Sequence, residues 1–419
     1  MMKKVYLCID LKTFFASCEC SERHLDPFKT NLVVADPTRG NGALCLAITP
    51  QMKSMGIHNR CRIFEIPKGV EYITAMPRMH LYMEYSARIY RIYCRYVSPD
   101  DIHVYSIDEC FIDITSYMHL YHKSAKAFAK MLMQAVFADT HITATCGIGT
   151  NLYLAKVALD IISKHTKENI GILDEERYQK YLWHHLPITD FWHMGSGTAN
   201  HLLKLGVVDM HGITQIPEEI LYKEFGINAE YIIDHAWGRE PATIASIKKY
   251  RPKNESINNS QVLFSDYEYE DAILVVKEMV ELNVLRLVES RLVTNHISLY
   301  IGYSRTDGGG WAGGSRKLTV RTNSLSVLMD AFISIYHLKV QKGRLIGQIS
   351  ISFGDVLDEA YESYDLFSDI EALEEEKKLQ KAIVSIRHKY GKNAILKLMN
   401  KQEKATTEKR NTLIGGHNA

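Results

Sequence analysis

The chain has 419 residues, too many for one hydrophobic core, which predicts about two to four domains. Its 46% hydrophobic and 24% charged residues are typical of a globular protein, and no stretch reaches the roughly 18 to 20 apolar residues of a membrane span. The net charge of +1 excludes a polycation, so a nucleic-acid binder would have to concentrate its basic residues locally. The eight cysteines form no CxxC clusters, which argues against a structural zinc site or a disulfide scaffold and favours reduced thiols in a cytoplasmic protein.

The first part of the chain alternates predicted strands and helices. Its opening apolar run meets Asp10 and Lys12 too soon for a secretion signal, so we interpret it as a core strand that ends on Asp10. The predicted strands are 4–10, 32–36, 43–48, 102–107, 110–115 and 142–149. The predicted helices are 77–97, 123–138 and 151–164, and the last can begin at Asn151.

The pattern changes near residues 171–190 to short helices containing Trp, His and Leu. Residues 241–260 are polar, basic and interrupted by Pro, which predicts a linker. A compact unit follows, with predicted helices 268–289 and 325–337, strands 296–303, 317–322 and 346–353, and a glycine-rich turn 307–314. Beyond Asp355 the chain is acidic, then Lys-rich and helical.

Two adjacent carboxylates, Asp108 and Glu109, interrupt the strand-like sequence YSIDECFID. If their strand lies beside the first one, Asp10 joins them. Converging carboxylates resist ionisation, and a divalent cation reverses this. Oxygen ligands suit Mg²⁺, and two such ions about 4 Å apart would serve an in-line phosphoryl displacement. For an isolated Asp-Glu pair, a surface hairpin is the competing interpretation. A further acid, Asp113, is expected to be structural.

The stretch CIDLKTFFASCE, together with SIDE farther along, resembles the Y-family (lesion-bypass) DNA polymerases. The likeness runs in matching order to about residue 356, and the tail resembles the bacterial UmuC-related branch. It implies an α+β, multidomain right-hand polymerase with a ferredoxin-like βαββαβ palm, small fingers, a helical thumb with a helix-hairpin-helix, and an α/β little finger. The implied domains are palm 1–12 and 80–170, fingers 13–79, thumb 171–241, linker 242–256, little finger 257–356 and C-terminal tail 357–419.

The resemblance implies a two-metal catalytic site. Asp10 and Asp108 would bind both Mg²⁺ ions, helped by the backbone carbonyl of Leu11. Glu109 would complete the site at the primer 3′-hydroxyl, so that the three acids are the catalytic residues.

The resemblance also implies contacts with the incoming nucleotide. The candidate residues are Phe14, Phe15, Thr49, Lys53 and Lys156. Phe15 holds the place of the steric gate, whose ring clashes with a ribose 2′-OH, whereas core packing is the favoured interpretation for Phe14. Pro50 stands where many members have a tyrosine, and it cannot donate a hydrogen bond. The sequence GIGT at 147–150 lacks the spacing of a P-loop and is expected to be a strand end with a close turn.

Two regions are predicted to contact DNA. The sequence HMGSGTANHLLKLGV resembles a helix-hairpin-helix, whose glycine turn offers backbone N–H groups to a phosphate. Gly195 and Gly197 are the candidates there, although His193 replaces the family's first glycine and a plain tight turn is an equal alternative. In the expected little finger, basic residues are concentrated, and Arg316, Lys317 and Arg321 are the candidates. A solvated sheet edge is the alternative.

The sequence ESYDLFSD resembles the short sliding-clamp motif at Leu366 and Phe367, with Ser363 where glutamine is usual. Residues 369–400 predict an amphipathic helix, which would pack on a partner or on the polymerase body. The sequence does not choose between the two.

The combined hypothesis is a template-directed translesion DNA polymerase of low fidelity, acting in DNA-damage tolerance and the SOS response. Its expected partners are primer–template DNA, dNTPs, the sliding clamp and accessory repair proteins, with no membrane. One alternative is another palm-type nucleotidyl transferase, which has no use for the hairpin or the little finger. The other is a catalytically inactive DNA- and clamp-binding relative, against which the presence of all three acids weighs.

Overall fold

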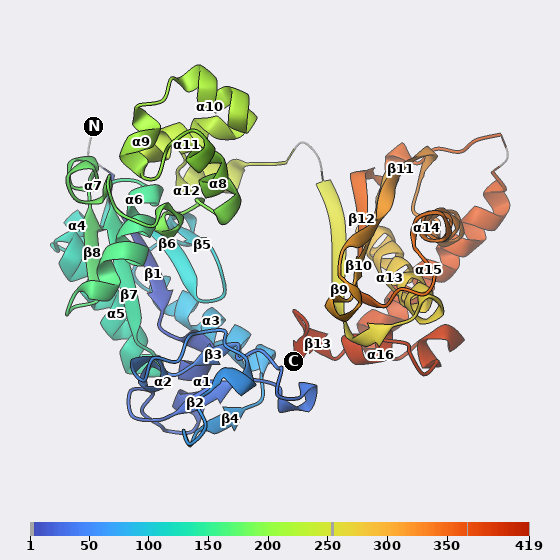
Figure 1. Ribbon diagram of the computed structural model, residues 1–419, viewed down its shortest axis with the longest axis horizontal. Coiled ribbons are helices and arrows are strands. Elements are labelled where there is room, and N and C mark those ends of the chain that lie inside the picture. Colours follow the sequence, from blue (N-terminus) through green and yellow to red (C-terminus); the bar gives the residue numbers. More distant parts are fainter. Residues whose placement is uncertain (1–3, 253–254, 367, 419) are drawn as a thin grey trace. The chain divides into compact units, whose positions relative to one another are not determined.

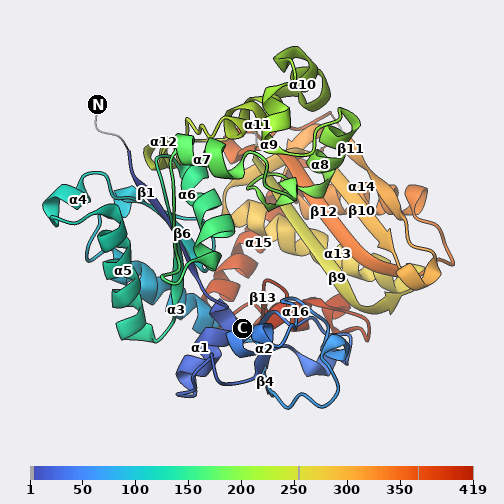
Figure 2. The ribbon, with the colours of Figure 1, turned by 60° about the vertical axis from the view of Figure 1, so that its left-hand side comes forward.

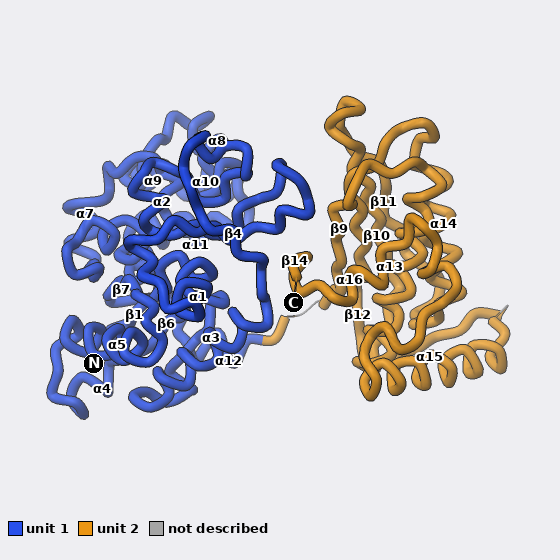
Figure 3. Tube along the Cα trace, turned by 90° about the horizontal axis from the view of Figure 1, so that it is seen from below, with its two compact units in different colours: residues 1–250 blue, residues 251–419 orange. Residues whose placement is uncertain are grey.

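The computed structural model describes residues 4–252, 255–366 and 368–418. The chain forms two compact units, residues 1–250 and 251–419, coloured separately in Figure 3. The boundary lies inside the segment 242–256 that the sequence predicts as a linker. Among the described helices, none is long and apolar enough to cross a membrane.

The first unit is built on a five-stranded sheet in the order β5-β6-β1-β7-β8. β1 is antiparallel to β6 and β7, and β8 is parallel to β7. The strands are β1 Tyr6–Leu11, β5 Ile102–Val104, β6 Glu109–Asp113, β7 Ala144–Gly149 and β8 Ile170–Leu173. The helices are α3 Met79–Tyr93, α4 Tyr117–Leu120, α5 Ala125–Thr140 and α6 Leu152–Val157. The first four strands have the order of the predicted βαββαβ unit, and β8 extends it.

Successive side chains of β1 point to opposite faces of the sheet, and the two faces pack against different helices. Leu7 and Ile9 pack in the core formed with α3 and α5, whereas Tyr6 and Cys8 pack with α6. α5 and α6 lie on opposite sides of the sheet (Figure 2). Asp10 follows the alternation of Cys8, so its carboxylate lies on the α6 face.

Glycines allow α6 to lie directly on β7. A Cβ at Gly147 would lie 2.0 Å from the Ala155 carbonyl oxygen, and one at Gly149 would lie 2.2 Å from the Ala155 nitrogen. Gly171, the partner of Gly147 on β8, would meet the Ala158 carbonyl oxygen at 2.3 Å. As the sequence predicts, GIGT is a strand end, and a bend at 150–151 leads from β7 into α6.

The helix predicted at 151–164 is divided. It begins with α6, capped by the side chain of Asn151, then passes into a π-helical turn at 158–162 and a 3-10 turn at 163–165. π-turns within helices occur frequently at functional sites.

The rest of the first unit forms a small sheet and a helical region. The sheet has the order β3-β2-β4, from β2 Leu32–Val34, β3 Ala47–Ile48 and β4 Ile73–Ala75. Its helices are α1 Phe14–Glu22 and α2 Pro50–Ser54. The helical region contains α7 Glu175–Leu182, α8 Ser196–Lys204, α9 Met210–Thr214, α10 Glu218–Phe225, α11 Ala229–Ala236 and α12 Ile244–Lys249.

The second unit is a four-stranded antiparallel sheet with helices on one face (Figure 1). The strand order is β11-β10-β12-β9. Its elements are β9 Glu255–Tyr267, α13 Tyr269–Glu289, β10 Leu292–Tyr303, β11 Trp311–Thr322, α14 Leu325–Lys339 and β12 Ile346–Asp358. The apolar side chains of all four strands pack against α13 and α14.

The C-terminal segment packs on the second unit. It contains α15 Ile370–Tyr390, α16 Thr407–Arg410, and a hairpin of β13 Leu413–Ile414 and β14 His417–Asn418. The buried carboxylate of Glu278 accepts hydrogen bonds from the Asn400 side chain at 3.0 Å and from the Thr406 N–H at 2.7 Å. Glu376 of α15 accepts from the Leu325 N–H at 2.6 Å and so caps α14. The sequence left open whether the tail packs on a partner or on the protein itself. In the structure it packs on the second unit.

The sequence prediction missed five of the described strands, β4, β8, β9, β13 and β14. The stretch 241–260 was wrongly predicted to be a linker throughout, because it contains α12 and the first residues of β9. Asn258 and Ser260 of β9 face away from the helices, while Leu263 packs in the core. Because this uncovered face of the strand carries polar residues, the segment has the composition of a linker.

Candidate active site and DNA-contacting surfaces

The three acids converge where β1 and β6 run side by side. Asp10 is the register partner of Glu109, and the Asp108 carbonyl accepts a hydrogen bond from the Leu11 N–H at 3.0 Å. Adjacency of the two strands therefore joins residues that lie far apart in the sequence, as the sequence predicts.

The acid cluster raises the pKa of Asp10 to about 7. Burial is the largest cause, and the neighbouring charges of Asp108 and Glu109 add to it. Three converging carboxylates are a ligand set that suits Mg²⁺, because a divalent cation offsets the repulsion between their negative charges. The residues present thus fit the expected cofactor.

Both carboxylate oxygens of Glu109 have a partner. Lys156 Nζ lies 2.9 Å from Oε2, and the thiol of Cys8 donates to Oε1 at 3.0 Å. Lys156 also lies 3.0 Å from Asp160 Oδ2, one turn along. Burial acts to lower the pKa of Lys156, but the charges of Asp160 and Glu109 outweigh it and raise the pKa, so the ammonium stays charged. Each carboxylate oxygen of Glu109 keeps a lone pair for a further ligand.

The two other acids of this strand pair have different surroundings. Asp108 is half-buried and accepts a hydrogen bond from the Ser106 hydroxyl at 2.7 Å. Asp113, at the far end of β6, is buried and contacts Lys4 Nζ at 2.8 Å and the Thr115 hydroxyl at 2.6 Å. These contacts agree with the predicted structural role of Asp113.

The two phenylalanines after Asp10 differ in burial. Phe14 is buried in the core, in keeping with its favoured interpretation, whereas Phe15 is half-buried. The Phe15 ring stacks on Tyr82 with centroids 4.5 Å apart. The Tyr82 hydroxyl donates to buried Glu19 at 2.8 Å, and Arg78 contacts the same carboxylate at 2.6 Å. Phe15 thus rests on a side chain held by a hydrogen bond to the buried Glu19 carboxylate.

The remaining nucleotide candidates differ in their access to solvent. Thr49 is fully buried, and its hydroxyl donates to the Thr30 carbonyl at 2.7 Å. That position gives Thr49 a structural role, because its hydroxyl is committed inside the small sheet. Lys53 of α2 is exposed. Loss of hydration lowers the pKa of Lys53, while the charge of Asp10 opposes the shift.

Several residues of this site were missed from the sequence. Cys8 carries a weak signal, since it lies two residues before Asp10 on one strand face. Asp160 lies four residues after Lys156, a spacing that pairs side chains on a helix. Tyr105 has no such signal in the sequence. The centre of its ring lies 5.9 Å from Lys156 Nζ, and its hydroxyl accepts a hydrogen bond from the Trp192 indole N–H.

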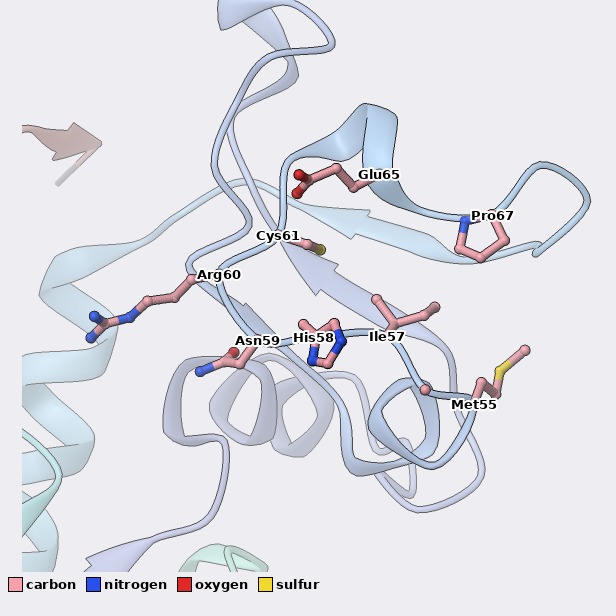
Figure 4. A pocket seen from close by; sticks show the side chains of 9 residues that line it. Met55, Ile57, His58, Asn59, Arg60, Cys61, Glu65 and Pro67 are labelled. Atoms are coloured by element: carbon pink, nitrogen blue, oxygen red, sulfur yellow. The ribbon is translucent and has the colours of Figure 1, made fainter. Parts of the chain in front are cut away.

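A separate pocket lies in the segment expected to be the fingers. It is lined by residues 55–61 with Glu65 and Pro67 (Figure 4). The carboxylate of Glu65 is directed toward Cys61, and Arg60 extends away from it. None of the three acids or of the predicted nucleotide-binding residues lines this pocket.

The predicted hairpin surrounds the start of α8. His193, which replaces the family's first glycine, has φ 67°, a conformation that glycine adopts without strain. Gly195 is the N-cap of α8, and a Cβ at Gly195 or Gly197 would meet nothing within 4 Å. The element before the hairpin is only a 3-10 turn, Ile188–Asp190.

The sheet of the second unit has an uncovered face with small polar side chains. Lys317 pairs with His296 and lies on this face, whereas Arg316 pairs with core residue Ile297 and remains exposed at the edge strand. Tyr300 and Trp311 stack on the same face with centroids 6.0 Å apart, a feature missed from the sequence. The small residues of this face are Ser260, Ser298, Ser315, Ser350 and Ser352.

Two predicted contacts lie at the edge of this sheet. The Arg321 guanidinium donates to the Asp355 carbonyl, which competes with a role in DNA contact. The Arg321 backbone carbonyl accepts a hydrogen bond from the Ser363 N–H at 2.9 Å. This bond anchors the start of the segment that resembles the clamp-binding motif. Leu366 in that segment is 98% exposed. Phe367 lies outside the described residues.

Comparison with known proteins agrees with this geometry. The family model described as impB/mucB/samB matches residues 9–160, which include the three acids and Lys156. UvrX of Bacillus subtilis (strain 168), named for UV-damage repair, is 30% identical over 99% of this chain and 98% of its own length. A protein named DNA polymerase IV 2 from the same organism is 27% identical over 100% of this chain and 99% of its own.

The fold also has a solved counterpart. A Y-family DNA polymerase chimera of Dbh and Dpo4 superposes with a TM-score of 0.63 at 18% identity, covering 84% of this chain and 99% of that chain. The α+β polymerase fold predicted from the sequence is confirmed by this match. The chain belongs to the impB/mucB/samB family of Y-family DNA polymerases.

Proposed function

We propose that the protein is a translesion DNA polymerase that adds dNTPs to a primer 3′-hydroxyl with two Mg²⁺ ions. The observation that carries the proposal is the convergence of Asp10, Asp108 and Glu109, in which the pKa of Asp10 is raised to about 7. Such a cluster is costly to the fold unless a cation shares it. The relatives named for DNA polymerase and UV-damage repair support the same activity.

The three acids would hold the two ions. Asp10 and Asp108, with the Leu11 carbonyl, would be shared ligands, and Glu109 would complete the site at the primer end. When bound, the ions lower the pKa of the attacking hydroxyl and neutralise charge on the α-phosphate and the leaving pyrophosphate. Lys156 and Cys8 orient the Glu109 carboxylate through contacts at 2.9 and 3.0 Å.

Two cationic side chains and one ring would select and hold the nucleotide. Lys156, charged and largely buried, would offer a proton donor to the triphosphate, with exposed Lys53 as a second cation. Phe15, supported by Tyr82, would exclude a ribose 2′-hydroxyl by steric clash. We leave Thr49 out of this set because its hydroxyl is buried.

The DNA and protein partners would use both units. Backbone N–H groups at the start of α8, near Gly195 and Gly197, would contact a phosphate. Lys317 and Arg316 would add sequence-independent contacts to phosphates. Exposed Leu366 supports docking of a sliding clamp, and accessory repair proteins would act on the same complex.

Primer extension tests the proposal. A labelled primer is annealed to an undamaged template and to one with an abasic site, and each is incubated with dNTPs and Mg²⁺. We expect extension on both templates that disappears with a chelator and in Asp108→Ala and Glu109→Ala proteins prepared identically. Absence of Mg²⁺-dependent extension by the wild-type protein would contradict the proposal.

A further inference from the structure

A second group of metal-ligating side chains lies in the helical region of the first unit, on elements other than those of the acid cluster. It consists of His184, which follows α7, Asp209, which caps α9, and His211, within α9. One ligand atom of each lies within 4.8 Å of those of the others. His184 Nδ1 is already 2.8 Å from Asp209 Oδ2, and the two imidazole rings have centroids 4.8 Å apart.

The main chain and a tryptophan hold this group in place. The His211 N–H donates to the Trp183 carbonyl at 3.1 Å, which joins α9 to the residue before His184. The Trp183 ring packs 5.0 Å from the His211 ring, and its indole N–H donates to the Ala236 carbonyl at 2.8 Å. Contacts of this kind restrict ligand orientation before an ion binds.

Asp209 is oriented as well. Its Oδ1 accepts a hydrogen bond from the Gly212 N–H at 2.7 Å and caps α9, which leaves Oδ2 on the side of His184.

We propose that His184, Asp209 and His211 bind a Zn²⁺ ion, with water as the fourth ligand. Two imidazole nitrogens and a carboxylate oxygen suit zinc better than Mg²⁺, which prefers oxygen ligands alone. Tetrahedral ligands at zinc bond lengths lie about 3.4 Å apart, so His184 Nδ1 and Asp209 Oδ2, now 2.8 Å apart, must separate slightly to admit the ion. Side-chain rotation of His184, which is 71% exposed, supplies that adjustment.

The ion would connect the two ends of the segment that contains the predicted hairpin. His184 precedes Gly195 and Gly197 in the chain, and Asp209 and His211 follow them. The site would therefore stabilise this segment. The proposal does not depend on polymerase activity, because none of its residues belongs to the acid cluster.

Cobalt titration of untagged protein tests the site. The protein is stripped of metal with a chelator, and excess Mg²⁺ is added to occupy the acid cluster. We expect a single equivalent of Co²⁺ to give tetrahedral absorption bands without a thiolate-to-cobalt band, and Zn²⁺ to displace it. His184→Ala and His211→Ala should each weaken binding by at least about tenfold. His185→Ala is the matched control, because His185 Nε2 lies 2.8 Å from Asp190 Oδ2 and His185 is not in the proposed ligand group.

Thermal melting gives an independent measurement. Zn²⁺ should raise the melting temperature of the wild-type and His185→Ala proteins by mass action but not that of His211→Ala. Because melting reports folding directly, a variant that fails to fold is recognised. Absence of Co²⁺ binding, binding unchanged in both histidine variants, or a thiolate band would each overturn the proposal.

Discussion

The ammonium of Lys156 lies 2.9 Å from the Glu109 carboxylate, so a residue of α6 is in direct contact with the acid cluster of β1 and β6. This contact exists because α6 lies on β7 with no side chains between their backbones. Gly147 and Gly149 are thus linked to the acids through the position of α6. The packing of α6 on the glycines of β7 therefore sets the position of Lys156 relative to Glu109.

Gly149→Ala should displace α6 and move Lys156 away from Glu109. The new Cβ would lie 2.2 Å from the Ala155 nitrogen, and overpacking of this kind costs about 1–3 kcal/mol. We expect a lower free energy of unfolding in urea and slower nucleotide incorporation. Gly42→Ala is the control, since its Cβ would meet nothing within 4 Å. Equal behaviour of the two variants would count against the packing argument.

Asp10→Asn should stabilise the protein in a pH-dependent way. The pKa of Asp10 is raised from 3.8 to about 7, so the folded state binds its proton more tightly than the unfolded state. The wild-type free energy of unfolding therefore falls as the pH rises from about 4 to about 7, and then levels off. Asparagine does not titrate, so the variant should gain a few kcal/mol over the wild type across this interval. Urea titrations without divalent cations measure the difference, and a pH-independent difference would refute the prediction.

Phe15→Ala should weaken discrimination against ribonucleotides. Removing the ring that stacks on Tyr82 removes the expected clash with a 2′-hydroxyl, and the ratio of kcat/KM for dNTP to that for rNTP should fall more than about tenfold. Phe14→Leu is the control, because Phe14 is buried and should affect stability alone. Unchanged sugar selection in Phe15→Ala would remove this residue from the site.

Arg316→Ala combined with Lys317→Ala should weaken binding to DNA of any sequence and reduce its dependence on salt. Each lost phosphate contact lowers the slope of log K against log salt by about one. Fluorescence anisotropy with primer–template DNA over a range of salt concentrations measures the slope. Lys378→Ala combined with Lys389→Ala, two exposed lysines on α15, controls for the loss of two charges. The same slope in the double variant and the control would exclude a phosphate contact at β11.

Local patterns predicted most strands and helices of the fold. The apolar run that ends on Asp10 and the Asp-Glu pair predicted that three acids meet if their strands are adjacent, and the structure has Asp10 beside Glu109. β9 was missed because its uncovered face is polar. Thr49 was misjudged because its burial depends on the small sheet, which local sequence does not reveal. The contacts of Glu109 with Cys8 and Lys156 join three elements and became evident only when these were packed together.

Single-turnover incorporation by Asp108→Asn and Asp113→Asn proteins tests the central claim most directly. Asp108 directly precedes β6, and Asp113 is the last residue of β6. Asp108 belongs to the acid cluster, whereas Asp113 contacts Lys4 and Thr115. With saturating dNTP and Mg²⁺, Asp108→Asn should slow incorporation by more than about a hundredfold. Loss of a residue that only hydrogen-bonds to a metal ligand costs about 10- to 100-fold, so a larger loss indicates a ligand. Asp113→Asn should stay within a few fold of the wild type. A wild-type rate in the Asp108→Asn protein would contradict the account.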